Sequence, residues 1–230
     1  MYLGNLGETM KKIILLLSLV SFLHASSVDE LKQHVRDTLP QLEGWCSEEK
    51  AEKLIDLVLE TKPEICVEIG VFGGRSLFPV AAALKHLGNG LIIGIDPWSE
   101  EECLKHFDPI KDAPHIQWWS KINIDLIYRS YLSMLSAEQL ANHVITLKVT
   151  AERAATLLAP IDILHIDTNH GEISSTKNIE LFLPKVRSGG YIWINDSLAY
   201  SMQPTIDYLL ERCEFIEVID NGNCILCRKK

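Results

Sequence analysis

The chain has 230 residues, enough for one well-buried α/β domain and too few for two domains of ordinary size. Hydrophobic residues make up 47% of it and charged residues 23%, which indicates a globular protein with a core rather than a disordered chain. The formal net charge of −9 at pH 7 repels the phosphate groups of nucleic acids, so the composition disfavours a nucleic-acid partner.

The N-terminus has the pattern of an export signal. Two lysines precede an apolar run from Ile13 to Leu23, and Ala25 offers a small residue at a cleavage site. The run is shorter than the roughly 20 apolar residues that span a bilayer, so no stable membrane span is expected. We expect residues 1–25 to be a signal peptide with a short upstream extension, and residues 26–230 to be a single exported domain, periplasmic or secreted. An uncleaved leader, which would leave the protein cytoplasmic or tethered to a membrane, is the alternative.

Two helices are expected next, over Val28–Leu39 and Ser47–Thr61. In the second helix Ser47 is a candidate N-cap, and apolar residues recur on one face. Such helices usually cover one edge of a sheet, and capping of a substrate is the less favoured role.

A glycine-rich loop follows the first strand of the predicted sheet. The strand Ile65–Ile69 leads into Gly70, Gly73 and Gly74, and a helix is expected over Arg75–Leu87. A strand, a tight loop and a helix N-terminus form the unit with which α/β proteins hold nucleotide-like ligands. The glycines are not spaced as in the dinucleotide motif G-x-G-x-x-G, which disfavours a nicotinamide cofactor.

The second strand, Leu91–Asp96, ends in an acid. In Rossmann-like folds an acid at this point accepts hydrogen bonds from two ribose hydroxyls. The nucleoside of NAD or of S-adenosylmethionine (SAM) would satisfy Asp96 equally. Trp98 could stack on the adenine, and covering the end of the sheet is an equally good interpretation of this ring.

Residues 99–140 hold an unusual concentration of rings, among them His106, His115, Trp118 and Trp119. Part of this region fits a helix that packs on the sheet. The part before Trp119 is long for a crossover loop, and long loops at strand ends are places where substrates bind. A substrate loop and plain packing are equal alternatives.

Oxygen-bearing side chains follow two later strands, expected over Ile161–Ile166 and Tyr191–Ile194. Asp167 comes directly after the first of these strands, and Asn195 and Asp196 come after the second. Because parallel strands end at the same edge of a sheet, we expect the three side chains to meet there. Three hard oxygen ligands that leave open positions suit Mg²⁺.

The C-terminal residues predict a hairpin. Strands are expected over Phe215–Ile219 and Cys224–Arg228, joined by the strong turn sequence Asp220–Asn223. The spacing of the six cysteines leaves open whether Cys213 and Cys224 are bridged across this hairpin.

The glycine loop resembles that of class I SAM-dependent methyltransferases, whose pattern E-x-G-x-x-x-G-x-S is matched by Glu68, Gly70, Gly74 and Ser76. Together with the C-terminal hairpin, the resemblance implies an α/β fold, a Rossmann-like, doubly wound seven-stranded sheet with an antiparallel C-terminal hairpin strand. It implies that SAM is the cofactor. The residues that it places around SAM are Glu68, Gly70, Phe72, Gly73, Gly74, Ser76, Asp96, Trp98, Thr150 and Ala151.

Asp167 with Asn195 and Asp196 resembles the Mg²⁺ triad of the metal-dependent O-methyltransferases, both the catechol type and the macrolide-sugar type. In that group the residue three after the first aspartate is the general base, and His170 holds this place. The resemblance covers roughly Gly44–Ser197. It implies Mg²⁺-assisted O-methylation of a small-molecule hydroxyl, with a sugar as one candidate, and makes His170 and Asp167 the catalytic residues. The family more often has two acids where this chain has Asn195 and Asp196.

Two other functions stay open at this point. A non-catalytic SAM-fold protein, acting as a binding or effector module, would fit the neutral Asn195 and export away from the cytosolic SAM pool. An NAD-linked oxidoreductase would fit Asp96, although the loop spacing and the terminal hairpin argue against it. The sequence does not name the methyl acceptor, and a homo-oligomer is left open.

Overall fold

The computed structural model describes residues 27–105, 107–157, 160–168 and 172–230. Its centre is a seven-stranded sheet in the order β3-β2-β1-β4-β5-β7-β6. Strands β1 to β5 pair in parallel, and β7 is antiparallel to both β5 and β6, so the predicted fold class is confirmed. The strands are β1 (Ile65–Ile69), β2 (Leu91–Ile95), β3 (Val144–Leu147), β4 (Ile161–Ile166), β5 (Val186–Asn195), β6 (Cys213–Ile219) and β7 (Cys224–Lys229).

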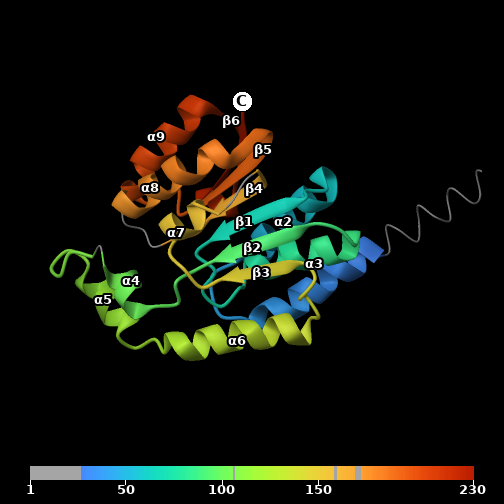
Figure 1. Cartoon of the computed structure of the whole chain (residues 1–230), viewed down its shortest axis with the longest axis horizontal. Helices are drawn as coiled ribbons and strands as arrows, with labels where there is room; N and C mark the ends of the chain where they lie inside the picture. Colours follow the sequence, from blue (N-terminus) through green and yellow to red (C-terminus); the bar gives the residue numbers. More distant parts are fainter. Residues whose placement is uncertain (1–26, 106, 158–159, 169–171) are drawn as a thin grey trace, which may run out of the picture.

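Helices cover both faces of the sheet. In Figure 1, α8 and α9 lie above the strands and α6 lies below them. After a helix over residues 27–38, the helical elements are η1 (Leu39–Gln41), α2 (Glu48–Thr61), α3 (Leu77–Leu87), α4 (Glu100–Leu104), α5 (Ala113–Trp119), α6 (Ile124–Ala137), α7 (Ala151–Ala155), α8 (Glu172–Phe182), η2 (Leu183–Lys185), η3 (Tyr200–Met202), α9 (Gln203–Arg212) and η4 (Asp220–Gly222).

Alternation along the strands produces the two helical layers, because successive side chains of a strand point to opposite faces. In β1, Cys66 packs in a core with residues of α2, α3 and α6, and Val67 packs in a second core with residues of α7, α8 and α9. The same rule separates Cys224 from Cys227 in β7, and each belongs to a different core. All six cysteines are free thiols, so the bridge that the sequence left open is not formed.

Two details of the chain differ from the sequence-based expectations. Strand β5 begins at Val186, before the expected start at Tyr191, and the register to β4 shifts between Ile161 and Ile163. The described part of residues 99–140 contains the helices α4, α5 and α6, where one helix and a loop were expected. In Figure 1, α4 and α5 lie beyond the arrowheads of β2 and β3, so part of this region covers the carboxyl edge of the sheet.

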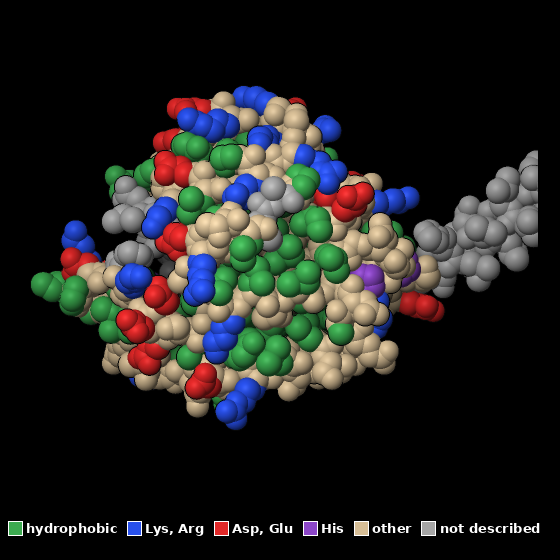
Figure 2. Space-filling view, viewed as in Figure 1, with side chains coloured by type: hydrophobic (Ala, Val, Ile, Leu, Met, Phe, Trp, Pro, Cys, Tyr) green, Lys and Arg blue, Asp and Glu red, His purple; other side chains and the backbone are tan. Residues whose placement is uncertain are grey.

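One outer face is partly apolar. Figure 2 shows hydrophobic side chains gathered across the middle of this face, in the region of β3 and α6. Exposed apolar residues on these two elements include Leu126, Leu132 and Ile145. In the described part of the chain, no helix has both the length and the apolar character that crossing a bilayer requires.

Candidate active site

A cavity of about 740 Å³ opens at the carboxyl edge of the sheet, a size typical of small-molecule sites. All three predicted metal ligands, Asp167, Asn195 and Asp196, contribute to its wall. Six of the predicted cofactor residues also line it: Gly70, Phe72, Ser76, Asp96, Thr150 and Ala151. The cavity therefore joins the two groups of residues that the sequence singled out.

The glycine loop is fastened to strands on both sides. Gly70 donates its backbone N–H to Ile95 at 2.9 Å, and Asp167 donates to Ile69 at 2.9 Å. Gly70 has a φ of +87°, and a Cβ placed there would lie 1.9 Å from the carbonyl oxygen of Asp167. Only glycine fits this position, because the loop after β1 passes directly against the end of β4.

Gly73 and Gly74 contact the chain rather than the cavity. A Cβ on Gly73 would lie 2.4 Å from the carbonyl oxygen of Glu43, and one on Gly74 would lie 2.7 Å from the ring of Tyr131. Neither residue is part of the cavity wall. Both glycines therefore give the loop its shape without facing a ligand.

Asp96 holds the glycine loop through its carboxylate. Its Oδ2 accepts hydrogen bonds of 3.0 Å from the backbone N–H groups of Val71 and Phe72, and its Oδ1 accepts one of 2.7 Å from Trp98. Burial raises the pKa of this carboxyl, and the three backbone donors oppose that rise. A carboxylate has about four acceptor positions, so one remains for a ligand in the cavity.

Glu68 lies beneath the loop, completely buried. The hydroxyl of Ser76 donates a hydrogen bond to Glu68 Oε1, which explains why Ser76 does not cap α3. Glu68 Oε2 is buried and has no hydrogen-bond partner in the described part of the chain. Glu68 is not part of the cavity wall, so it supports the loop from behind.

Trp98 packs in the core instead of facing the cavity. Its ring lies 5.2 Å from that of Tyr131 and 4.6 Å from that of Tyr128, and the residue is 2% exposed. Its Nε1 donates a 2.7 Å hydrogen bond to the carbonyl oxygen of Phe72. Of the two interpretations that the sequence left open, covering the sheet end describes the observed position, and the ring does not lie where it would stack on a ligand.

Aromatic rings form the mouth of the cavity. Trp45 lies 5.4 Å from Phe72 and 5.4 Å from Trp118, measured between ring centroids. Trp119 packs edge-on against Trp118 at 5.0 Å and lines the cavity. Residues 99–140 thus supply core rings from α6 and a cavity wall from α5.

The segment before α2 and the start of that helix also line the cavity. From the sequence, contact with a substrate is the less favoured role for this part of the chain. Trp45, Cys46, Ser47 and Lys50 all line the cavity. Ser47 caps α2 as predicted, accepting a 3.1 Å hydrogen bond from the backbone N–H of Lys50. The expectation that these helices only cover a sheet edge is wrong for this segment.

Lys50 is the residue that sequence reasoning missed. Its Nζ lies 3.3 Å from Asp167 Oδ2, and its side chain is 2% exposed. Burial by itself would lower the pKa of this ammonium, but the neighbouring acids, Asp167 foremost and Glu68 further away, raise it above its ordinary value. Lys50 therefore places an ammonium group from α2 beside Asp167, at the end of β4.

Two of the predicted metal ligands, Asp167 and Asn195, contact other protein groups. Asn195 Oδ1 lies 3.2 Å from His165 Nε2 and 3.3 Å from Cys224 Sγ. Asp196 follows with a left-handed φ of +58° and is only partly buried. Asp167 is paired to Lys50 through Oδ2, so two of the three predicted ligands contact other protein groups, and the Mg²⁺ site stays a prediction.

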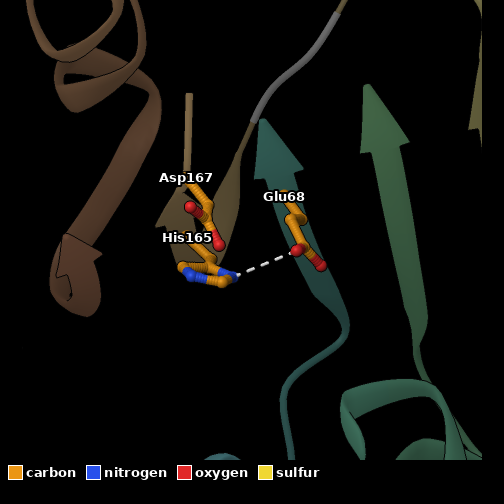
Figure 3. A group of neighbouring side chains, drawn as sticks. All are labelled: Glu68, His165 and Asp167. Atoms are coloured by element: carbon orange, nitrogen blue, oxygen red, sulfur yellow. Dashed lines mark ion pairs between the residues drawn. The ribbon is translucent and has the colours of Figure 1, made fainter. Parts of the chain in front are cut away.

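A different group of described side chains comes close enough to share an ion. The ligand atoms of Glu68, His165 and Asp167 lie within 4.8 Å of one another. Figure 3 shows Glu68 on β1 facing His165 on β4 and Asp167 just after that strand. His165 Nδ1 lies 3.4 Å from Glu68 Oε1. Because Glu68 also accepts from Ser76 and His165 Nε2 faces Asn195, these side chains already form a buried chain of polar contacts across the strand ends.

The predicted base, His170, lies outside the described residues. The other predicted catalytic residue, Asp167, is at the cavity wall and 23% exposed at its side chain.

A family model described as a methyltransferase domain matches residues 67–197. No curated protein matches the sequence at a significant level. Among solved structures, the O-methyltransferase NovP is 17% identical with a TM-score of 0.63, covering 80% of this chain and 81% of that one. The O-methyltransferase TomG of Streptomyces achromogenes, solved with SAM, is 18% identical with a TM-score of 0.59 and 88% coverage of both chains. An O-methyltransferase of Bacillus cereus, solved with S-adenosylhomocysteine (SAH), is 15% identical with a TM-score of 0.58, covering 87% of this chain and 91% of that one.

These structures share the fold of the described chain, and the family match spans more than half of the sequence, from β1 to the residues after β5. The glycine loop, Asp96 and Asp167 all lie inside the matched region. The chain therefore belongs to this methyltransferase-domain family and has the class I methyltransferase fold.

Proposed function

We propose that the protein transfers a methyl group from SAM to a hydroxyl group of a small molecule, with a sugar among the candidate acceptors. One observation carries the proposal: a single cavity brings together Gly70 and Asp96, which suit a nucleoside cofactor, and Asp167, which suits a reacting hydroxyl. TomG, solved with SAM, and the Bacillus cereus protein, solved with SAH, are O-methyltransferases, which supports this choice of cofactor and reaction.

The cofactor would lie along the glycine loop. The free acceptor position of Asp96 would take a ribose hydroxyl, and the cavity wall at Thr150 and Ala151 would lie beside the adenine. Ser76 also lines the cavity, beside the methionine end. When bound, SAM supplies an electrophilic methyl group, whose transfer forms a carbon–oxygen bond as the sulfur–carbon bond breaks and leaves neutral SAH.

The chain must then hold the acceptor and take its proton. The rings of Phe72 and Trp119 would enclose the acceptor at the cavity mouth and exclude water. His170 would accept the hydroxyl proton, since an imidazole titrates near neutral pH. The proton leaves the acceptor oxygen as the methyl group arrives, so the product is a neutral ether.

Mg²⁺ assistance, which the resemblance to metal-dependent enzymes implies, is not part of this mechanism. Asp167 is paired with Lys50, and the amide oxygen of Asn195 faces His165 and Cys224. A Mg²⁺ ion bound to Asp167 would lie beside the Lys50 ammonium. No step here depends on a metal.

Isothermal titration of the full chain with SAM, SAH and NAD tests the cofactor. We expect saturable binding of SAM and SAH in the micromolar range that is usual for enzyme substrates, and no binding of NAD. A panel of sugars, catechols and other small alcohols, followed by SAH release, then tests the transfer. A protein that binds NAD but not SAM would contradict the proposal, and SAM binding without SAH release from any acceptor would favour the non-catalytic module.

We also propose that the protein is exported as one domain that begins near Ser26. The support is the pattern of the first 25 residues, which lie outside the described part of the structure. Mass spectrometry of the exported form should give the mass of a chain that begins at Ser26. A mass that includes Lys11 would show that the leader is retained.

A further inference from the structure

The feature that the proposed function leaves unused is a buried positive charge on α2. Lys50 is 1% exposed, although lysine is rarely buried without a charged partner. It faces the same way as Leu54, Leu57 and Val58, which are core residues of the helix. The chain therefore places an ammonium group where the helix otherwise presents apolar side chains to the sheet.

The ammonium group of Lys50 contacts Asp167, the residue on which the predicted metal site depends. Lys50 Nζ lies 3.3 Å from Asp167 Oδ2, across 117 positions of sequence. Both residues line the cavity. A divalent ion bound to Asp167 would lie within a few ångströms of this ammonium, and repulsion at that distance in a poorly solvated site is strong.

Asn195, another of the predicted metal ligands, also contacts protein groups. Its amide oxygen faces His165 and Cys224, and the residue is 5% exposed. Since Asn195 is neutral, the site has less negative charge to hold a dication than three acids would give it. A single ammonium balances the charge of Asp167 without a metal.

We propose that Lys50 takes the place of a divalent cation in this methyltransferase, so that the site works without a metal and Lys50 contacts the oxygen of the methyl acceptor. The ammonium has three N–H donors, and its hydrogen bond to Asp167 uses one of them. Another donates to the acceptor hydroxyl, stabilises the negative charge that develops on its oxygen, and holds it in the cavity. This role of Lys50 in catalysis rests on the proposed methyl transfer. The claim that Lys50, and not a metal ion, is the cation beside Asp167 does not depend on that transfer.

The first experiment measures metal binding alone. Mn²⁺ is added to the full chain and its free concentration is read by electron paramagnetic resonance, for the wild type, Asp167→Asn, Lys50→Met and the double variant. Lys53→Met is the matched control, because Lys53 lies on the same helix and pairs with Glu217 at 2.9 Å, outside the cavity.

We expect Asp167→Asn and Lys53→Met to leave Mn²⁺ binding unchanged. Lys50→Met should bind Mn²⁺ about tenfold or more tightly than the wild type, because a like charge has been removed from beside Asp167. The double variant should lose this gain. Wild-type Mn²⁺ binding that Asp167→Asn abolishes would overturn the proposal, and so would a folded Lys50→Met variant with no gain.

Circular dichroism shows whether Lys50→Met folds. If Lys50→Met does not fold, Lys50→Arg replaces it as a variant that keeps the charge. The comparison of Mn²⁺ binding by the wild type and by Asp167→Asn then tests the proposal without Lys50→Met. The second experiment measures turnover with an acceptor found as above. Wild-type turnover should be unchanged by EDTA, and Lys50→Met should lose about 10²–10³-fold in turnover, as for other oxyanion donors, while its affinity for SAM is unchanged.

The two proposals fail differently. Loss of wild-type turnover in EDTA, restored by Mg²⁺, would overturn the role of Lys50 and leave methyl transfer intact. Absence of methyl transfer to any acceptor would remove the proposed function, while the Mn²⁺ titration would still identify the cation at Asp167.

Discussion

Asp96 Oδ2 lies 3.0 Å from the backbone nitrogen of Phe72, so the acid at the end of β2 holds the loop that follows β1. The other oxygen of the same carboxylate accepts from Trp98 at 2.7 Å. Asp96 therefore fixes the shape of the glycine loop before any ligand is present. Its remaining acceptor position is the one that the proposed function gives to the ribose.

Asp96→Ala should weaken SAM binding by about 1.5–3 kcal/mol, the usual cost of losing hydrogen bonds to a charged group. It should also lower the melting temperature, because the N–H groups of Val71 and Phe72 lose their acceptor. Titration calorimetry and thermal unfolding measure the two effects. Asp207→Ala, an exposed acid on α9, is the control. Unchanged SAM affinity in a folded Asp96→Ala protein would remove Asp96 from the cofactor site.

Ser76→Ala should lower the free energy of unfolding by about 1–3 kcal/mol, because a buried carboxylate would lose a donor. The hydroxyl of Ser76 bonds Glu68, which is fully buried and has a second oxygen that no described group bonds. Urea unfolding gives the value, with Ser133→Ala on the exposed face of α6 as control. Equal effects of the two substitutions would show that the bond to Glu68 contributes nothing to stability.

Trp98→Ala should lower the free energy of unfolding by about 3–5 kcal/mol, as is usual for a large buried ring. Trp98→Phe should cost less, since only the Nε1 hydrogen bond to Phe72 and part of the packing are lost. SAM affinity should change little in Trp98→Phe, because the ring does not line the cavity. A large loss of SAM affinity with unchanged stability would instead support the adenine-stacking interpretation.

Trp118→Ala should raise KM for the acceptor and leave SAM affinity and the melting temperature nearly unchanged. The side chain is 38% exposed and contacts Trp45 and Phe72 at the cavity mouth, so it contributes little to the core. Leu132→Ala, at a similarly exposed position on α6, is the control. An unchanged KM would exclude the aromatic mouth from acceptor binding.

Stability should fall as the pH rises above about 9, where thiols of the unfolded chain ionise. Burial raises the pKa of Cys46 and Cys227 to about 12, so the folded state keeps protons that the unfolded state releases. The stability that these thiols contribute is complete below pH 9 and is lost as the pH approaches 12. Cys227→Ala should show a shallower decline of the urea midpoint over this range. The same slope in both proteins would contradict the raised pKa.

The sheet and the outline of the site could be predicted because their signals are local. Short apolar runs that end in Glu68, Asp96 or Asp167 mark strands whose carboxyl ends meet at one edge. The resemblance to a known family, together with the C-terminal hairpin, then implied a doubly wound seven-stranded sheet with an antiparallel hairpin strand. The structure and the family match bear out that part.

The partners of individual side chains could not be predicted, because they depend on contacts between distant segments. Lys50 stands on the apolar face of its helix, four positions before Leu54, and a lysine on such a face is a visible signal of a buried charge. The sequence gives no signal that Asp167, 117 residues later, is the partner of Lys50. The sequence likewise places Asn195 at the end of β5, but the direction of its amide is set by His165 and Cys224 on neighbouring strands.

The region matched by the family model does not contain all the residues that line the cavity. The matched region runs from residue 67 to residue 197, yet Lys50 stands before it and Asn223 after it, and both line the cavity. A fragment trimmed to the matched region would lose α2 from one wall and the β6–β7 hairpin from another. Recombinant expression and domain grafting should therefore keep the flanking segments, since a shared catalytic module would be incomplete if moved without them.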